Sequence, residues 1–529
     1  MRIERKRVIA CILTVLLAII ETIKHDMSPI YWLPIVNVSI VIILVFVISN
    51  EGIKKFINVL TAVCTVACVA GAIVLRFHWR NHIGEYLYWQ VVAAIINIWA
   101  IAVIAIGYLI RMIKTKERLF KPGIIAILWI LFSVLSSVHK NQYWSITIFF
   151  AFGCFYLTKF HKNDWYSLWE GVFDGLIISF LGMQFVSLAF RPYTTFRYSG
   201  AFVNPNDTAT FYVIVFAALL SKMAFLWEKA RQKRSWKIVL PLLAAWCSAL
   251  IFYTMGRTAY IAAMLIMLFF AVFIMGRRWK IKPGKIILRL GAFLLCFIVM
   301  IPVVYMLIRY CPAAVNHRVW LYSERTQEDI DKWNSGSDDR YVSTGELADK
   351  LILKFVPGLE NKKSEEKKKE EHKEVVLPEP SDTCVIVRDD LKVSSKLPLS
   401  LNIRIATYKE YLRYSSLFGE INTNRHFCFA SNGETCWHSQ NLWIQITYEY
   451  GYIAGGILLL LTLLIIIRAF KTAVKGQNAI SVIPLLFTTV FMVIGLMEVV
   501  WLPGLVVLEL FLMVQHPVQY QIDEETESQ

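Results

Sequence analysis

The chain has 529 residues, of which 57% are hydrophobic and 18% are charged, and its mean hydropathy is +0.53. A soluble protein of this length would carry more charge and would interrupt its apolar runs. The formal net charge of +16 is spread over short links between apolar runs and forms no single basic face, so we expect no nucleic-acid partner.

Apolar runs long enough for membrane-spanning helices recur along the chain. A helix needs roughly 20 apolar residues to cross the hydrocarbon core, and a β-barrel would show shorter, alternating segments. The sequence therefore predicts an all-α, polytopic helical membrane protein with about 14 transmembrane helices. The predicted spans lie near 8–22, 31–49, 57–75, 89–110, 123–138, 143–159, 167–190, 208–227, 238–254, 258–276, 286–308, 444–467, 478–498 and 503–516.

Basic residues in the links between these spans predict the topology. The first apolar run follows MRIERKR and has no small-residue cleavage site, so we expect a retained signal anchor. One set of alternate links holds 27 Lys and Arg, whereas the short links of the other set hold seven. Because Lys and Arg mark the cytoplasmic side, both termini are predicted in the cytoplasm. The predicted domains are a membrane domain 1–308 with spans 1–11, a loop 309–440, the last three spans in 441–518 and a cytoplasmic tail 519–529.

The loop 309–440 is predicted to lie outside the cytoplasm. Its 20 Lys and Arg nearly balance its 21 Asp and Glu, so it is not a polybasic lipid-binding tail. The charged stretch NKKSEEKKKEEHKEVV (361–376) cannot bury a core, and we expect a solvated helix or a disordered insert there. The flanks 316–333 and 401–419 are predicted amphipathic helices over the membrane mouth. A long loop of this kind often carries function.

Four of the ten cysteines, Cys311, Cys384, Cys428 and Cys436, fall in this loop. In an oxidising compartment four thiols allow three pairings. A Cys428–Cys436 bond would close a small ring directly before His438, and the alternative is that some of the thiols stay free. The sequence leaves the pairing open.

Three arginines are predicted near the outer membrane surface, where a charge needs a reason to be present. Arg197 lies between the seventh and eighth spans, Arg257 lies in a very short link, and Arg404 lies on the 401–419 helix. Each alone would more often be an interfacial side chain whose apolar stem lies along the membrane. Three of them together with His438 favour an anionic substrate, because a guanidinium holds phosphate oxygens in a bidentate manner.

His438 is the candidate general base of this set. Its unperturbed pKa of about 6.5 leaves a large neutral fraction near neutral pH. It would accept a proton from an attacking hydroxyl while arginines stabilise a departing diphosphate. The alternative is a structural histidine that caps a helix. Glu498 is a candidate for orienting His438 or an arginine.

Other acidic pairs and motifs point away from metal chemistry. Glu170 and Asp174 share a helix face and are predicted to be partners of Lys162, not a catalytic pair. The sequence has no Walker-type loop and no HExxH, so we expect neither a metal nor a cofactor.

Three stretches resemble the superfamily of O-antigen ligases and Wzy-type polysaccharide polymerases of bacterial envelopes. RYSGAFVNPNDTATF (197–211) is similar to the family's Arg-x-x-Gly-x-Phe-x-x-Pro-Asn segment, and MGRTAYIAA (255–263) is similar to its Ser-Arg-Gly-Ala segment with Gly in place of Ser. HSQNLWIQITYEYG (438–451) is similar to its His-Asn-x-x-Leu-Gln…Glu-x-Gly segment. Arg404 and Tyr408 lie where the family has Arg-x-x-x-Trp. The resemblance rests on the order and spacing of these segments.

The third segment departs from the family pattern. The family's histidine before asparagine falls on Gln440, and this chain has its histidine at His438. In an extended segment the two positions point to the same side, whereas on a helix they lie about 200° apart. The resemblance gives Asn206, Gln440 and Asn441 supporting roles beside His438 and the arginines.

The resemblance implies a metal-independent glycosyltransferase with a GT-C-like fold in the bacterial cytoplasmic membrane, acting on the outer face. The donor would be an oligosaccharide on undecaprenyl diphosphate and the acceptor a glycan hydroxyl, with a chain-length regulator and a flippase as further partners. A repeat-unit polymerase is favoured and an O-antigen-type ligase is the alternative. A lipid-linked oligosaccharide flippase is the rival from another class. Transporters often show paired repeats and broken helices, and the sequence shows no sign of either.

Overall fold

The computed structural model describes residues 2–23, 123–137, 145, 148–149, 152, 162–191, 193, 197–202, 204–228, 236–315, 342–355, 384–387, 399–419, 426–429, 435–436, 438–501 and 506–516. The predicted spans near 31–49, 57–75 and 89–110, the insert 361–376 and the tail 519–529 lie outside the described residues, as does most of the span near 143–159.

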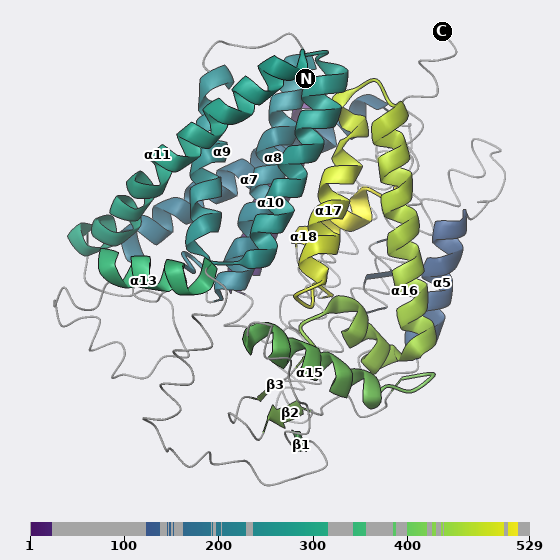
Figure 1. The fold of residues 1–529 in the computed structure, drawn as a ribbon. Helices are drawn as coiled ribbons and strands as arrows, with labels where there is room; N and C mark the ends of the chain where they lie inside the picture. The colour runs from purple at the N-terminus through teal and green to yellow at the C-terminus, as the bar shows by residue number, and fades with distance from the viewer. Residues whose placement is uncertain are drawn as a thin grey trace, which may run out of the picture.

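Long apolar helices form a bundle (Figure 1). Six helical segments of the described chain are long and apolar enough to cross a membrane, and each coincides with a predicted span. This confirms the helical, membrane-type architecture. The six are α7 (Lys162–Phe190), α8 (Pro205–Glu228), α9 (Trp236–Tyr253), α10 (Arg257–Phe269) with its continuation η1 (Phe270–Arg278), α11 (Pro283–Val315) and α16 (Leu442–Lys475).

Four further helices coincide with predicted spans. They are α1 (Arg2–Ile23), α5 (Ile124–Ser136), α17 (Ile483–Gly495), which the short turn η3 (Ala479–Ser481) precedes, and α18 (Val506–Met513). The helices α17 and α18 are shorter than a bilayer-spanning helix of roughly 20 residues. The total of about 14 spans therefore stays a prediction.

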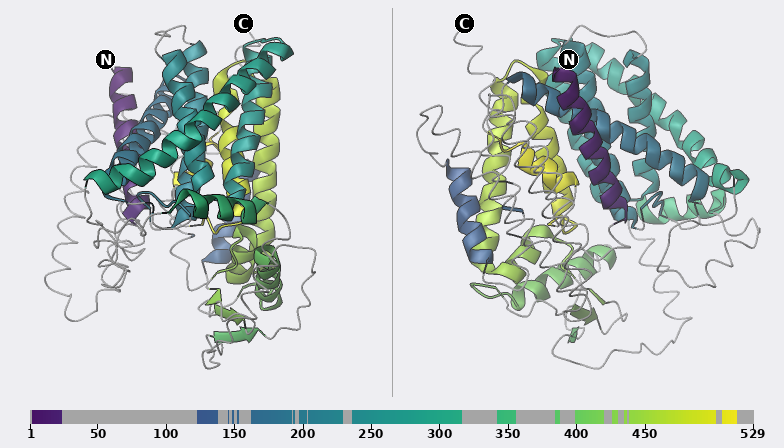
Figure 2. Two further views of the ribbon diagram at one scale, coloured as in Figure 1. Left: turned by 60° about the vertical axis from the view of Figure 1, so that its left-hand side comes forward. Right: turned by 180° about the vertical axis from the view of Figure 1, so that it is seen from behind.

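Small residues let α1, which is purple in Figure 2, lie closely alongside α7. A Cβ added to Gly171 would stand 2.3 Å from the carbonyl oxygen of Arg7, and one added to Gly175 would stand 2.6 Å from that of Cys11. Close approach through small residues is the usual way in which membrane helices pack. Since Arg7 faces Gly171 and Cys11 faces Gly175, the two helices run parallel.

A charge cluster joins α1, α7 and α8. Asp174 forms ion pairs with Arg7 at 2.5 Å and with Lys222 at 2.7 Å, and Glu170 lies 3.7 Å from Arg7. The sequence had pointed to Lys162 as the partner of these carboxylates. The structure assigns them partners from other helices, because helix packing brings Arg7 and Lys222 onto the carboxylate face of α7.

The core of the bundle surrounds α8. Most α8 side chains are buried, including every residue from Thr208 to Ser221. Aromatic rings connect α7 to α17, with Trp169 stacked on Phe487 at 5.6 Å between ring centroids. Rings also connect α17 to α18, where Phe491 and Phe511 stack at 3.8 Å. This packing fixes the end of α17 and the residues that follow it, 496–498.

The predicted loop contains more regular structure than expected. The helix α13 (Thr344–Phe355) and the helix α15 (Leu399–Arg413) lie at the lower end of the bundle in Figure 1. The predicted helix 401–419 is found only as far as Arg413, and residues 414–419 are not helical. A small sheet, absent from the sequence prediction, has the order β1 (Cys384–Val387), β2 (His426–Phe429), β3 (Thr435–Cys436). The pair β1 and β2 is parallel and the pair β2 and β3 is antiparallel.

The structure describes the thiol of one of the four cysteines predicted in the loop 309–440. Cys311 is a free thiol within α11, which runs on to Val315, so the loop begins later than the predicted residue 309. In the sheet Phe427 lies opposite Cys436 and Cys428 lies opposite Thr435. The pairing of Cys384, Cys428 and Cys436 concerns side chains outside the described part of the chain.

The helix α16 is broken at Gly451, which has φ +94°. The segment after α15 fills the break: Tyr452 N donates to Ser416 O at 3.0 Å, and a Cβ on Gly451 would stand 2.5 Å from the Gly419 nitrogen. Gly419 itself has φ +89°. The expectation that the chain has no broken helix is therefore wrong, because the freed N–H groups of α16 find acceptors in this loop.

Candidate functional site

Three distant segments meet at the turn that follows α17, residues 496–498, here called the α17 turn. It lies at the same end of the bundle as α15, where α8 and α16 begin (Figure 1), and this end is called the site end. Its Leu496 carbonyl accepts hydrogen bonds from Asn441 at 3.0 Å and from the Tyr408 hydroxyl at 3.3 Å. Its Met497 carbonyl accepts one from Arg404 at 2.9 Å. The α17 turn thus holds the predicted site segments in one place.

Arg197 is linked to the same turn through the Asn206 side chain. Its Nε donates to the Thr254 carbonyl at 3.0 Å, and its Nη2 donates to the side-chain oxygen of Asn206. The Asn206 amide nitrogen in turn donates to the Glu498 carboxylate at 2.7 Å. Glu498 therefore orients an arginine, one of the two roles considered for it, and it does so through Asn206.

The surroundings of Arg197 make it a partly desolvated cation. Burial lowers the pKa of its guanidinium, the Glu498 carboxylate raises it, and the charge of Arg404 lowers it again. A guanidinium stays protonated in proteins, so Arg197 keeps its charge in an environment where electrostatic interactions are stronger than in water. Arg197, Arg404 and the Glu498 carboxylate together carry one net positive charge.

Arg404 is positioned by α15, which is anchored by aromatic rings. Tyr411 is fully buried and its ring lies 4.6 Å from Phe427 of β2 and 5.0 Å from Tyr448 of α16. The Arg404 Nη1 also lies 3.3 Å from the Met497 sulfur. Burial raises the pKa of Tyr408, one turn along α15, while the charge of Arg404 acts against this. These contacts place Arg404 and Tyr408 on the face of α15 that meets the α17 turn.

Asn441 is the helix cap of α16. Its side-chain oxygen accepts from Ile444 N at 3.1 Å, which is the usual capping contact, and its amide nitrogen binds the Leu496 carbonyl. Ser439 is buried and its N–H donates to the Gln445 side chain at 2.8 Å. Gln440, between them, has φ +54°, an uncommon conformation outside glycine. The segment is thus neither a helix nor a regular extended strand, the two cases considered for the Gln440 position.

His438 stands at the start of this segment and is exposed. Desolvation by the surrounding protein still lowers its pKa below 6.5, with Arg404 lowering it further and Asp207 raising it. Its Nδ1 accepts the Gln440 N–H at 3.2 Å. The neutral ring then carries its proton on Nε2, so the ring must turn away from the Gln440 N–H before Nδ1 can accept another proton.

Arg257 is the first residue of α10 and is half-buried. It follows Thr254, whose carbonyl binds Arg197, and Met255, which has φ +55°. The structure therefore gathers Arg197, Arg404 and His438, together with their supporting residues, around the α17 turn and places the start of α10 directly beside Arg197.

Sequence reasoning missed several members of the site. The carbonyl groups of Thr254, Leu496 and Met497 carry no sequence signal, because every residue has one. Asp207 follows directly after Asn206, and an acidic residue in the first turn of a helix is usually assigned to the helix dipole. Within the described part of the chain no three His, Cys, Asp or Glu side chains gather as metal ligands would.

Comparison with family models, with curated proteins and with solved structures gave no match to this chain.

Proposed function

We propose that the chain is a membrane glycosyltransferase that moves an oligosaccharide from undecaprenyl diphosphate to a sugar hydroxyl, as a repeat-unit polymerase. The observation that supports this most is that the α17 turn holds Arg404 directly and Arg197 through Asn206, and also holds Asn441, three residues after His438. Two guanidiniums beside an imidazole suit a phosphate-bearing leaving group. The site end would then face outward, and both termini would be cytoplasmic.

The proposed reaction is a single group transfer. The oxygen of the acceptor hydroxyl forms a bond to the anomeric carbon of the donor, and the bond from that carbon to the diphosphate oxygen breaks. The electron pair leaves with the diphosphate, whose added charge Arg197 and Arg404 stabilise, with Arg257 as a third cation. His438 takes the hydroxyl proton once its ring has left the Gln440 N–H. Asn206 and Asn441 hold the arginine and the segment in place.

Reconstitution in vesicles tests this proposal. The purified protein receives a synthetic undecaprenyl-diphosphate repeat unit without metal, and longer glycan and free undecaprenyl diphosphate are the expected products. His438→Ala should lose nearly all activity, and Arg404→Ala should weaken donor use. Arg413→Ala is the matched control, since Arg413 lies on the same helix with a side chain 75% exposed. Unchanged turnover in His438→Ala would contradict the base assignment, and glycan transfer to a single terminal acceptor without repeats would identify a ligase.

A flippase is the second candidate because one observation favours it. Transporters use broken helices beside their substrate sites, and α16 is broken at Gly451, close to the site segments. A flippase would move the intact donor across the bilayer. A vesicle assay with donor on one side separates the two functions: appearance of intact donor on the other side without release of undecaprenyl diphosphate would reject the enzyme.

A further inference from the structure

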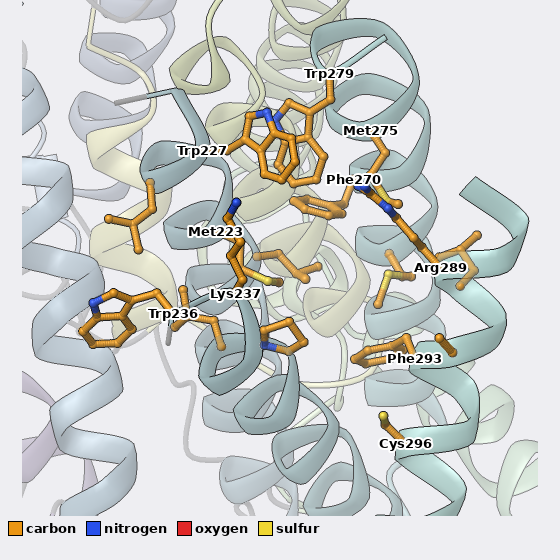
Figure 3. A pocket seen from close by; sticks show the side chains of 17 residues that line it. Met223, Trp227, Trp236, Lys237, Phe270, Met275, Trp279, Arg289, Phe293 and Cys296 are labelled. Atoms are coloured by element: carbon orange, nitrogen blue, oxygen red, sulfur yellow. The ribbon is translucent and has the colours of Figure 1, made fainter. Parts of the chain in front are cut away.

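An apolar cavity lies toward the opposite end of the bundle from the site, and Figure 3 shows the side chains that line it. Its volume is about 410 Å³, within the range of small-molecule sites, roughly 300–1,000 Å³. Along α8, the lining residues Leu220 and Trp227 stand 14 and 21 positions from Asn206, which is about 21 and 30 Å of helix. The helices α8, α9, α10, η1 and α11 surround the cavity, which is here called the tryptophan pocket.

Aromatic and sulfur-containing side chains line the tryptophan pocket. Trp227 and Trp279 stack at 4.5 Å between ring centroids on one side of it (Figure 3). Met223, Met267 and Phe293 are among the apolar residues deeper in the wall. Methionine side chains adapt to flexible apolar ligands, and tryptophan is the residue that most often marks the level of lipid headgroups.

Two cations stand over the same tryptophan. Lys237 of α9 lies 5.6 Å from the Trp227 ring centroid, and the Arg289 guanidinium of α11 lies 5.7 Å from it. Both side chains are exposed, and no lining residue among those described is acidic. The neighbouring Glu228 carboxylate instead accepts the Ala479 N–H. The pocket therefore combines an apolar interior with a positively charged rim.

We propose that the tryptophan pocket binds an anionic phospholipid of the surrounding membrane. The phosphate would lie between Lys237 and Arg289, and an acyl chain would enter the apolar cavity. Three observations support a phospholipid as the ligand: the charge of the rim, the apolar lining, and the position at the end of helices long enough to cross a membrane. Basic pockets between membrane helices bind anionic headgroups in this way. The inference is independent of the chemistry proposed at the site end.

Native mass spectrometry of the full chain tests the proposal, with phosphatidylglycerol, phosphatidylcholine of the same acyl chains, and inorganic phosphate as probes. Phosphatidylglycerol should be retained in preference to phosphatidylcholine. Each basic residue contributes about a factor of five in affinity for an anionic lipid, so Lys237→Ala combined with Arg289→Ala should weaken retention about 25-fold. The matched control combines Lys282→Ala with Lys285→Ala, two exposed lysines of the same region that do not line the pocket.

A second pair of variants tests the cavity without changing charge. Cys296 lines the pocket, whereas Leu295, 63% exposed, does not line it. Cys296→Trp should fill the cavity and abolish retention, and Leu295→Trp should leave it unchanged. Equal retention of both lipids, or unchanged retention in the double alanine variant or in Cys296→Trp, would overturn the proposal. Binding of inorganic phosphate as tight as that of phosphatidylglycerol would show a simple anion site and would also overturn it.

Discussion

The Asn206 side chain donates a hydrogen bond of 2.7 Å to Glu498, although 292 positions separate the two residues in the chain. Asn206 also accepts a hydrogen bond from Arg197. One amide therefore joins a cation in the connection before α8 to a carboxylate in the α17 turn. Through this link Glu498 fixes the position of Arg197.

The first prediction concerns this link. Asn206→Ala should lower the free energy of unfolding by about 1.5–3 kcal/mol, because both of its hydrogen bonds involve charged groups. Glu498→Ala should remove part of the same interaction, so the double variant should be less destabilised than the sum of the two. Thermal unfolding of the two single variants and the double variant in detergent measures this coupling. Asn163→Ala, at an exposed position of α7, is the control. Strictly additive effects would show that the two residues are not coupled.

The second prediction concerns the pH dependence of activity. A histidine must be neutral to act as a general base. The pKa of His438 is lowered by desolvation and by Arg404. The acid limb of kcat/KM should therefore lie below pH 6.5. Arg404→Ala removes a lowering influence and should move the limb to higher pH, whereas Asp207→Asn removes a raising influence and should move it to lower pH. Shifts of the same sign in both variants, or a rate that rises on acidification, would reject His438 as the base.

The third prediction concerns the break in α16. A side chain at Gly451 would meet both a left-handed φ and the backbone of Leu417, so Gly451→Ala should destabilise the fold by about 1–3 kcal/mol. It should also reduce activity, because the segment that docks on this break directly follows α15, the helix that carries Arg404. Gly456→Ala is the control: no atom lies within 4 Å of the added Cβ, and it should stabilise the helix by about 0.5–1 kcal/mol. Thermal unfolding of the two variants should give shifts of opposite sign.

The fourth prediction concerns the charge cluster. Lys222 is buried and its ammonium lies 2.7 Å from Asp174. Lys222→Met removes one of the two cations that pair with Asp174 and leaves the other, Arg7, in place, so it should cost less than the roughly 3–5 kcal/mol of a buried charge left unpaired. Lys471→Met, at an exposed position of α16, should change stability little. Combining Lys222→Met with Asp174→Asn should recover part of the loss, and failure to recover any would show that Lys222 acts through packing alone.

Much of the helical architecture follows from sequence alone. A continuous apolar run of about 20 residues is stable in few places other than a membrane-type helix, whatever its neighbours are. For this reason α8 and α9 begin and end within a few residues of the predicted spans. The candidates Arg197, Arg404 and His438 were also visible in the sequence, because ionisable side chains predicted near the outer membrane surface need a reason to be there.

Only the tertiary structure decided how these residues are connected. The carbonyls of Leu496 and Met497 hold Asn441 and Arg404, and a carbonyl leaves no trace in a sequence. The pairing of Asp174 with Lys222 depends on the relative rotation of two helices, which many weak packing contacts set together. The close contact of Gly419 and Gly451 likewise depends on chain segments that meet only after folding. Local pattern determined the helices of this protein, and long-range packing determined its site.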